Sequence, residues 1–271
     1  MPFLRTENAG LIEIWYEEAG QGAPVVLIGG LTSTTEVWGR QVPGLAATHR
    51  VVTLDNRGSG RTRLAEDDGV RSPERFAGDV RALLDGLGLE RVHLLGASMG
   101  GAIVQAFALS WPERLRSLVI ACSSPGGSHA VAAGPEVIQA LLRGSGAEAP
   151  PEAARAALEV ALHPATFEKR PGAVAFYEGT KRAWPHPTAE IARRAAGIAG
   201  FDAWKGLASL AVPTLVITGA GDRLVPPENS RRLAARIPGA ELAVIPDSGH
   251  VFFVEQPEAT NRALLEFFAK H

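Results

Sequence analysis

A serine flanked by glycines follows an apolar run in HLLGASMGGAIVQAF, residues 93–107. Its pattern is G-x-S-x-G, with Gly96 and Gly100 on either side of Ser98. The run before Ser98 predicts a strand, and the residues after it predict a helix that begins without a linker. Such a turn exposes the hydroxyl at the end of a sheet and directs the first N–H groups of the helix toward nearby negative charge. The pattern therefore predicts that Ser98 is a nucleophile.

Two other interpretations of these glycines are less favoured. They could serve only a strand-to-helix turn, but a strand before Ser98 and a helix after it are the context in which G-x-S-x-G is specific. A phosphate-binding loop does not fit, because Ala102 stands where that loop needs lysine.

A serine nucleophile needs a histidine to take its proton and a carboxylate to orient the histidine. His250 lies in VIPDSGHVFFVEQPE, after the last predicted strand, and Asp222 lies in LVITGAGDRLVPP, after another strand. In proteins that present a nucleophilic serine at such a strand-to-helix turn, the three residues follow one another along the chain in the order serine, aspartate, histidine. Asp247 is a rival acid, although its place in a PDSG turn favours a turn role. We therefore predict Ser98, Asp222 and His250 as the catalytic residues.

Short apolar runs alternate with longer helical patterns along the chain, which predicts an α/β protein with a mostly parallel sheet. The first predicted strand alternates in polarity and indicates an antiparallel edge, whereas the others are continuous apolar runs typical of strands covered on both faces. The predicted strands are residues 12–18, 24–29, 50–55, 91–96, 115–121, 213–219 and 240–246. The predicted helices are residues 36–47, 73–87, 99–111, 227–236 and 257–269.

The alternation stops after about residue 127 and resumes at Pro213. The segment between them is rich in Ala, Pro and Gly and has helical patterns without a convincing strand. It predicts an inserted helical cap over residues 126–208, between core segments 1–125 and 209–271.

The chain resembles the α/β-hydrolases over nearly its whole length. The motifs that carry the resemblance are GASMGG, GAGDRLVPP, SGHVFFVEQPE, LDNRGSGRT and LIGGLTSTTEVW. Within that superfamily it resembles small-cap serine hydrolases of the 3-oxoadipate enol-lactonase and carboxylesterase group. The resemblance implies a twisted, mostly parallel sheet with helices on both faces and an inserted helical cap.

The resemblance also implies an oxyanion hole and a substrate pocket. The backbone N–H groups of Met99 and Leu31 would hold the oxyanion, in a loop where Gly29-Gly30 replaces the commoner His-Gly pair. Gly30, Trp38, Val225 and Val251 would line the pocket. In LDNRGSGRT, Asp55 and Arg57 are expected to fix a loop beside the site.

Aromatic residues crowd into the alanine-rich cap, and we expect about half of them to face the substrate, with Phe176 and Trp184 as lining residues. The six are Phe167, Phe176, Tyr177, Trp184, Phe201 and Trp204. No Lys or Arg motif in the cap indicates a substrate carboxylate. The arginine pairs 193–194 and 231–232 are expected on solvated helix faces. The predicted substrate is therefore a largely apolar ester or lactone.

Composition excludes several classes of partner. The 27 basic and 29 acidic side chains give a net charge of -2, which favours neither nucleic acid nor an anionic membrane as a partner.

The sequence also predicts the location of the protein. The single cysteine, Cys122, cannot form an intrachain disulfide, and the N-terminus lacks a signal-peptide pattern, so we expect a cytoplasmic protein. No apolar run approaches the ~18 residues of a membrane span. Neither a metal nor a cofactor is predicted, and the chain could form a homo-oligomer.

The predicted reaction is hydrolysis through an acyl-enzyme on Ser98, with His250 as general base and acid. Serine at the nucleophile position disfavours the dehalogenase and epoxide hydrolase branches, which use aspartate there. Three alternatives stay open: a carbon-carbon bond hydrolase of ring-cleavage products, a cofactor-free perhydrolase, and a ligand receptor that kept the triad.

Overall fold

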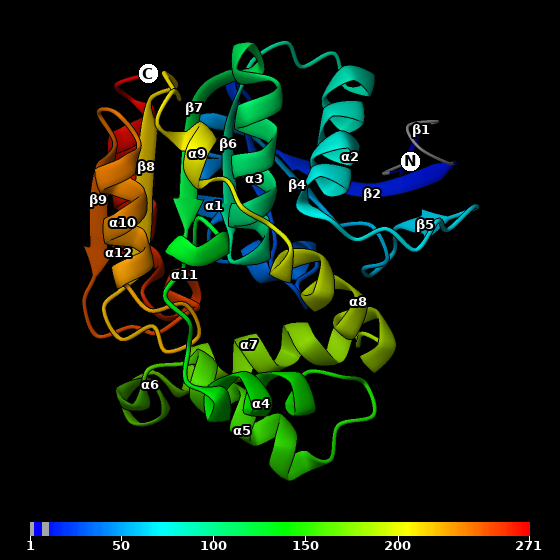
Figure 1. The fold of residues 1–271 in the computed structure, drawn as a ribbon, viewed down its shortest axis with the longest axis vertical. Coiled ribbons are helices and arrows are strands. Elements are labelled where there is room, and N and C mark those ends of the chain that lie inside the picture. Colours follow the sequence, from blue (N-terminus) through cyan, green and yellow to red (C-terminus); the bar gives the residue numbers. More distant parts are fainter. Residues whose placement is uncertain (1–2, 7–10) are drawn as a thin grey trace.

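The computed structural model describes residues 3–6 and 11–271. The expectation of no signal peptide rests on the N-terminal residues, of which 1–2 and 7–10 lie outside the described part of the chain. In the described chain, a nine-stranded sheet has the order β1-β2-β4-β3-β6-β7-β8-β9, with β5 paired to β2 (Figure 1). The strands are β1 (Phe3–Thr6), β2 (Ile12–Ala19), β3 (Ala23–Ile28), β4 (His49–Leu54), β5 (Arg63–Leu64), β6 (Val92–Ala97), β7 (Leu115–Ala121), β8 (Thr214–Gly219) and β9 (Glu241–Ile245).

In the order of the sheet, each pair of neighbouring strands from β4 through β3, β6, β7 and β8 to β9 is parallel. Strand β2 is antiparallel to β1, β4 and β5. Side chains of the buried strands alternate between two apolar clusters. In β3, Val26 and Ile28 pack into one cluster, and Val25 and Leu27 pack into the other. Helices therefore cover both faces of the sheet, which confirms the predicted fold class.

Each face of the sheet has its own set of helices (Figure 1). The first face carries α2 (Pro73–Gly86), α3 (Met99–Ser110), α9 (Trp204–Leu207) and α10 (Glu228–Arg236). The second face carries η1 (Thr35–Trp38), α1 (Val42–Leu45), α11 (Phe252–Glu255) and α12 (Pro257–Phe268). Two short turns, η2 (Pro112–Arg114) and η3 (Gly127–His129), complete the connections.

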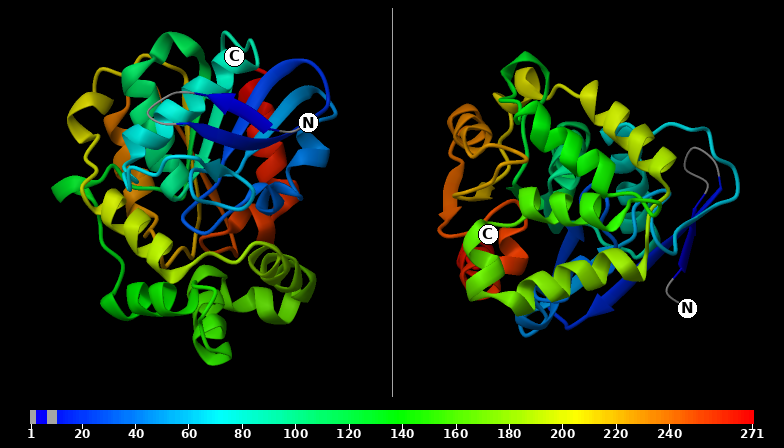
Figure 2. Two further views of the ribbon diagram at one scale, coloured as in Figure 1. Left: turned by 90° about the vertical axis from the view of Figure 1, so that its right-hand side faces the viewer. Right: turned by 90° about the horizontal axis from the view of Figure 1, so that it is seen from below.

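Five helices gather beyond one end of the sheet as a separate layer (Figures 1 and 2), and we call them the cap helices. They are α4 (Pro135–Gly144), α5 (Pro151–Ala161), α6 (Pro164–Lys169), α7 (Pro171–Ala183) and α8 (Thr188–Ala199). Proline opens the first four, where its missing N–H costs no helical hydrogen bond. The exact limits of the cap, 126 and 208, stay a prediction.

Two details of the predicted fold are wrong. Strand β2 is not an edge, because β1 pairs with its outer side through Phe3 and Trp15. The helix expected over 36–47 is two short helices, η1 and α1, because Pro43 has no N–H to continue a helix and instead lies in the first turn of α1. None of the helices in the described residues is both long and apolar enough to span a bilayer.

Candidate active site

Ser98 lies in a strained turn between β6 and α3. Its backbone has φ 58° and ψ −117°, a conformation that is rare for a residue with a side chain. The flanking glycines are required by close backbone approach: a Cβ on Gly96 would lie 2.0 Å from the Gly100 oxygen, and one on Gly100 would lie 2.3 Å from the Ile28 oxygen. Helix α3 therefore begins directly against β3, with Ser98 at its N-terminus.

His250 is paired with Asp222. Nδ1–H of His250 donates to Oδ2 of Asp222 over 2.8 Å, since a carboxylate can only accept. The other carboxylate oxygen of Asp222 accepts the N–H groups of Leu224 and Val225, each at 2.9 Å. Asp247, by contrast, has a φ of 49°, and its carbonyl accepts a hydrogen bond from Arg170. The rival acid thus lies in a turn, as its sequence indicated.

Cys122 connects the serine turn with the Asp222–His250 pair. Ser98 N–H donates to the carbonyl of Ala121, and the thiol of the next residue, Cys122, lies within 4.8 Å of ligand atoms of both Asp222 and His250. These three residues could in principle hold a metal ion. However, burial raises the pKa of the Cys122 thiol well above its ordinary value, and Asp222 already occupies Nδ1 of His250. Both features disfavour a metal ion at this cluster.

The loop after β3 lies beside the serine. A Cβ on Gly30 would come within 3.2 Å of Ser98 Cβ. Met99 is the first residue of α3, so its N–H has no acceptor within the helix. Both features suit the predicted oxyanion hole of Leu31 and Met99, which stays a prediction.

Cap and core residues bind the carbonyl groups of three residues in this loop. Asn56 Nδ2 donates to Gly29 at 3.0 Å, and Arg194 Nη1 donates to Leu31 at 2.8 Å. Lys181 Nζ donates to the Thr32 carbonyl at 2.9 Å. Two of these three donors come from the cap, so the cap helps to position the loop.

The loop in LDNRGSGRT has the expected structural role. Arg57 forms a buried bidentate ion pair with Asp79, at 2.9 and 2.6 Å. Asp55 accepts the N–H of Thr35 at 2.8 Å and that of Arg61 at 2.9 Å. Arg57 is therefore engaged within the protein rather than free to bind an anion.

The predicted lining residues lie in different surroundings. Trp38 is 1% exposed and packs 4.9 Å from the ring of Phe253. The ring of Phe176 lies 4.8 Å below the Arg40 guanidinium. Val251 is buried, and Val225 is half-buried beside Asp222.

Trp184 joins the cap to the core. Its Nε1 donates to Glu36 at 2.9 Å, and the Arg61 guanidinium lies 4.8 Å from its ring. Its role toward substrate stays a prediction.

A cavity of about 500 Å³ lies among α4, α5 and α7. Of the six aromatic residues of the predicted cap segment, only Tyr177 is among the described residues that line it. Two lining residues also contact the site loops: the Ala161 carbonyl accepts the His250 N–H at 2.9 Å, and Lys181 binds Thr32. The cavity thus borders the candidate active site.

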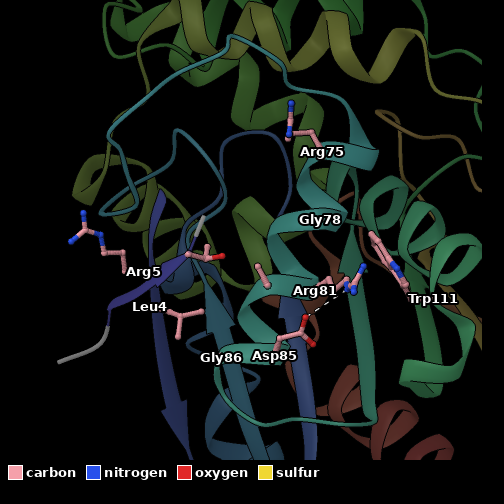
Figure 3. A pocket seen from close by; sticks show the side chains of 10 residues that line it. Leu4, Arg5, Arg75, Gly78, Arg81, Asp85, Gly86 and Trp111 are labelled. Atoms are coloured by element: carbon pink, nitrogen blue, oxygen red, sulfur yellow. Dashed lines mark ion pairs between the residues drawn. The ribbon is translucent and has the colours of Figure 1, made fainter. Parts of the chain in front are cut away.

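A second cavity, of about 540 Å³, lies between β1 and α2 (Figure 3). Its lining includes Arg75, Trp111 and the ion pair of Arg81 with Asp85. None of the candidate catalytic residues is part of that lining. The same three residues are absent from the lining of the cap cavity, but there Ala161 and Lys181 bind the loops of the candidate site, so the cap cavity is the better candidate for substrate.

Three functional candidates lacked a local sequence signal. Arg194 was expected in solvent with Arg193, Arg231 and Arg232, but only Arg193 and Arg231 are exposed, and Arg232 is half-buried. Arg194 is fully buried, because Glu190 and the carbonyls of Arg57 and Leu31 bind its guanidinium.

The second candidate is Lys181, and the third is Glu255. The buried carboxylate of Glu255 accepts Gly249 N–H at 2.7 Å, His163 N–H at 2.8 Å and the Thr166 hydroxyl at 2.5 Å. It therefore ties the histidine loop to the cap. The two cap partners lie about ninety residues away in sequence, so no local sequence pattern can indicate this role.

Comparison with known proteins agrees with this geometry. The family model described as "alpha/beta hydrolase fold" matches residues 23–257. The chain belongs to the α/β-hydrolase family. It is 33% identical to a putative carbamate hydrolase RutD of Azorhizobium caulinodans, over 98% of both chains. It is also 33% identical to a 2-hydroxy-6-oxononadienedioate/2-hydroxy-6-oxononatrienedioate hydrolase of Paraburkholderia xenovorans, over 97% of this chain and 93% of the relative.

Among solved structures, this α/β-hydrolase is similar to a thermophilic esterase from Thermogutta terrifontis. The TM-score is 0.86 at 29% identity, covering 100% of this chain and 99% of the esterase. These relatives are hydrolases with different substrates. The comparisons therefore support a hydrolase, and the choice of substrate has to come from the site.

Proposed function

We propose that this hydrolase cleaves a small carboxylic ester or lactone, largely apolar in character, through an acyl-enzyme on Ser98. The observation that carries most weight is the 2.8 Å hydrogen bond from His250 to Asp222. Ligand atoms of both residues lie within 4.8 Å of the thiol of Cys122, which follows the residue whose carbonyl accepts Ser98 N–H. The similarity to an esterase over the whole chain supports the same reaction class.

The roles of the residues follow from their contacts. Because Nδ1 of His250 is occupied by Asp222, Nε2 is the nitrogen that takes the Ser98 proton as the hydroxyl attacks the carbonyl carbon. The N–H groups of Met99 and Leu31 would stabilise the resulting oxyanion. His250 then returns the proton to the leaving alcohol, which in a lactone stays attached to the acyl chain. Water releases the acyl group by the same steps in reverse order.

Asp222 would act through His250. Its charge stabilises the imidazolium that forms during each proton transfer, and its geometry selects the productive tautomer. The N–H groups of Leu224 and Val225 hold one carboxylate oxygen and leave the other for His250. Asp222 is therefore a rigid acceptor.

The test is turnover by the purified protein of p-nitrophenyl esters of increasing acyl length and of a panel of lactones. We expect hydrolysis that Ser98→Ala reduces by roughly 10³-fold or more in kcat with unchanged folding. An organophosphonate should label Ser98, as located by peptide mass spectrometry. Activity of Ser98→Ala within tenfold of the parent would refute the assignment of the nucleophile.

Carbon-carbon bond hydrolysis is the second candidate, supported by 33% identity to the Paraburkholderia xenovorans hydrolase. Turnover of a ring-cleavage product without turnover of any ester or lactone would favour it. Peroxide-dependent halogenation or peracid formation would instead indicate a perhydrolase. Ligand binding without any turnover would indicate a receptor.

A further inference from the structure

Lys181 places an ammonium group at the boundary between the cap and the oxyanion loop. Its Nζ donates to the carbonyl and the hydroxyl of Thr32, at 2.9 and 2.5 Å, and both partners are neutral. The ring of Tyr177 lies 4.7 Å from Nζ. Among the described residues, no carboxylate oxygen lies within 4.0 Å of this ammonium. The other cap cation at the loop, Arg194, by contrast lies 3.0 Å from a carboxylate oxygen of Glu190. One of the three N–H donors of Lys181 is therefore left for another partner.

Burying an ammonium without an anion is unfavourable, because the charge loses its hydration. Burial lowers the pKa of Lys181 to about 7. The group is therefore partly protonated at neutral pH, and an anion placed on Nζ would favour the protonated form.

The walls of the cavity around Lys181 are mainly apolar with an excess of basic groups. Its ionisable lining residues are Arg155, Glu178, Lys181, Arg182 and His186. Burial lowers the pKa of His186 to about 3, so this histidine is neutral near pH 7. Arg155 already pairs with Glu159 at 2.8 Å. The charged groups on or beside η1 include Glu36, Arg61 and Arg40. Glu36 pairs with Arg61 at 2.7 Å, and Arg40 lies over Phe176.

Lys181 binds the loop that lies beside the nucleophile. Thr32 is two residues after Gly30, so their Cα atoms are at most about 7.6 Å apart. A Cβ on Gly30 would lie 3.2 Å from Ser98 Cβ. A short acyl chain bound to Ser98 could therefore extend toward Nζ.

We infer that Lys181 binds a carboxylate group carried by the substrate, so that the preferred ester or lactone has an apolar chain with an anionic end. This inference rests on the proposed function, since it concerns the substrate of the same site. It replaces the expectation that the cap has no cation for a substrate carboxylate. Lys181 would be a specificity-determining residue, with no part in the proton transfers.

The test compares two esters of the same acyl length. Mono-p-nitrophenyl glutarate has a terminal carboxylate where p-nitrophenyl pentanoate has a methyl group. We expect the native protein to prefer the glutarate ester about tenfold or more in kcat/KM, mainly through KM, because a hydrogen bond to a charged group has this magnitude. Lys181→Met should abolish the preference. The matched control, Lys169→Met, changes an exposed lysine of the cap and should keep it.

A merely structural lysine would give a different result. If Lys181 only holds Thr32, Lys181→Met will slow both esters equally and leave their ratio unchanged, which overturns the inference. Lys181→Arg, which keeps the charge, should retain most of the preference. Should Lys181→Met fail to fold, the native protein alone still tests the inference. Its preference for the glutarate ester should fall as pH rises from about 6 to 9, because Nζ loses its proton while the carboxylate stays charged. A constant preference would also overturn the inference.

A failure of the proposed function can be recognised separately. If the native protein hydrolyses neither ester, the ester proposal fails while the role of Lys181 is still measurable by calorimetry with glutarate and pentanoate. Glutarate should then bind about tenfold more weakly to Lys181→Met than to the native protein. Equal affinity of the two proteins for glutarate would overturn the inference.

Discussion

Arg194 of the cap donates a hydrogen bond of 2.8 Å to the carbonyl oxygen of Leu31, the residue whose N–H is proposed for the oxyanion hole. The same guanidinium reaches the carbonyl of Arg57 at 3.2 Å and the carboxylate of Glu190 at 3.0 Å. Glu190 in turn binds Arg71 at 2.5 Å. Because this network is buried, the cap helix α8 and the oxyanion loop are expected to move as one unit.

Replacing Arg194 by methionine should therefore slow catalysis without removing a catalytic group. We expect kcat to fall about 10- to 100-fold with a smaller change in KM, since a displacement near 1 Å at a reacting centre costs that much. Steady-state kinetics on the best ester or lactone checks this. Arg193→Met, at a neighbouring exposed arginine, is the control and should leave kcat and KM nearly unchanged. An unchanged kcat in a folded Arg194→Met protein would show that the loop does not depend on the cap.

Asp222→Asn should reduce kcat by about 10³- to 10⁴-fold, because an amide can present an N–H to the histidine and select the wrong tautomer. Asp247→Asn is the matched control. It should remain within a few-fold of the parent, since asparagine tolerates the φ of 49° found there. If Asp247→Asn were the slower variant, the acid would have to be reassigned to Asp247.

Gly100→Ala should destabilise the fold by several kcal/mol, because the added methyl group would overlap backbone atoms rather than a flexible side chain. The new Cβ would lie 2.3 Å from the oxygen of Ile28. Gly179→Ala is the control in a cap helix, where nothing lies within 4 Å of the added carbon. It should stabilise the protein by roughly 0.5–1 kcal/mol. Urea unfolding of both variants measures the difference, and equal midpoints would contradict the tight approach of α3 to β3.

The sequence predicts those parts of the molecule that depend on local patterns. Strand β6 was expected at 91–96 and lies at Val92–Ala97, because an uninterrupted apolar run fits a strand buried on both faces. Ser98, Asp222 and His250 could be proposed together because each follows a strand and the ends of parallel strands share one edge of the sheet. Arg194 could not be placed in this way.

What the sequence misses is set by contacts between distant residues. Arg194 and Leu31 are 163 positions apart, and Lys181 and Thr32 are 149 apart. Both cap residues lie on alanine-rich helices where basic side chains are usually solvated, so no periodicity distinguishes the buried Arg194 or the half-buried Lys181. The position of β2 was misjudged for a related reason: the strand that covers it, β1, has only four residues and gives no pattern of its own.

The last prediction concerns stability and pH at Lys181. Burial lowers its pKa from 10.5 to about 7, whereas the unfolded chain keeps the ordinary value. Between those two values the unfolded protein binds more protons than the folded one, so this residue makes the free energy of unfolding rise with pH. The unfavourable burial of the charge is felt in full below pH 7 and fades as the amine becomes neutral. Lys181→Met should therefore raise Tm most at about pH 6 and progressively less toward pH 9.

Thermal unfolding of the native protein and of Lys181→Met across this pH range measures the effect. Lys169→Met, at an exposed lysine, should show a Tm difference that does not change with pH. Glutarate should reduce the advantage of Lys181→Met at low pH, since a bound carboxylate compensates the buried ammonium and stabilises only the native protein. A Tm difference for Lys181→Met that stays constant over the whole range would mean that the ammonium is hydrated, and it would remove the physical reason for assigning a carboxylate to this position.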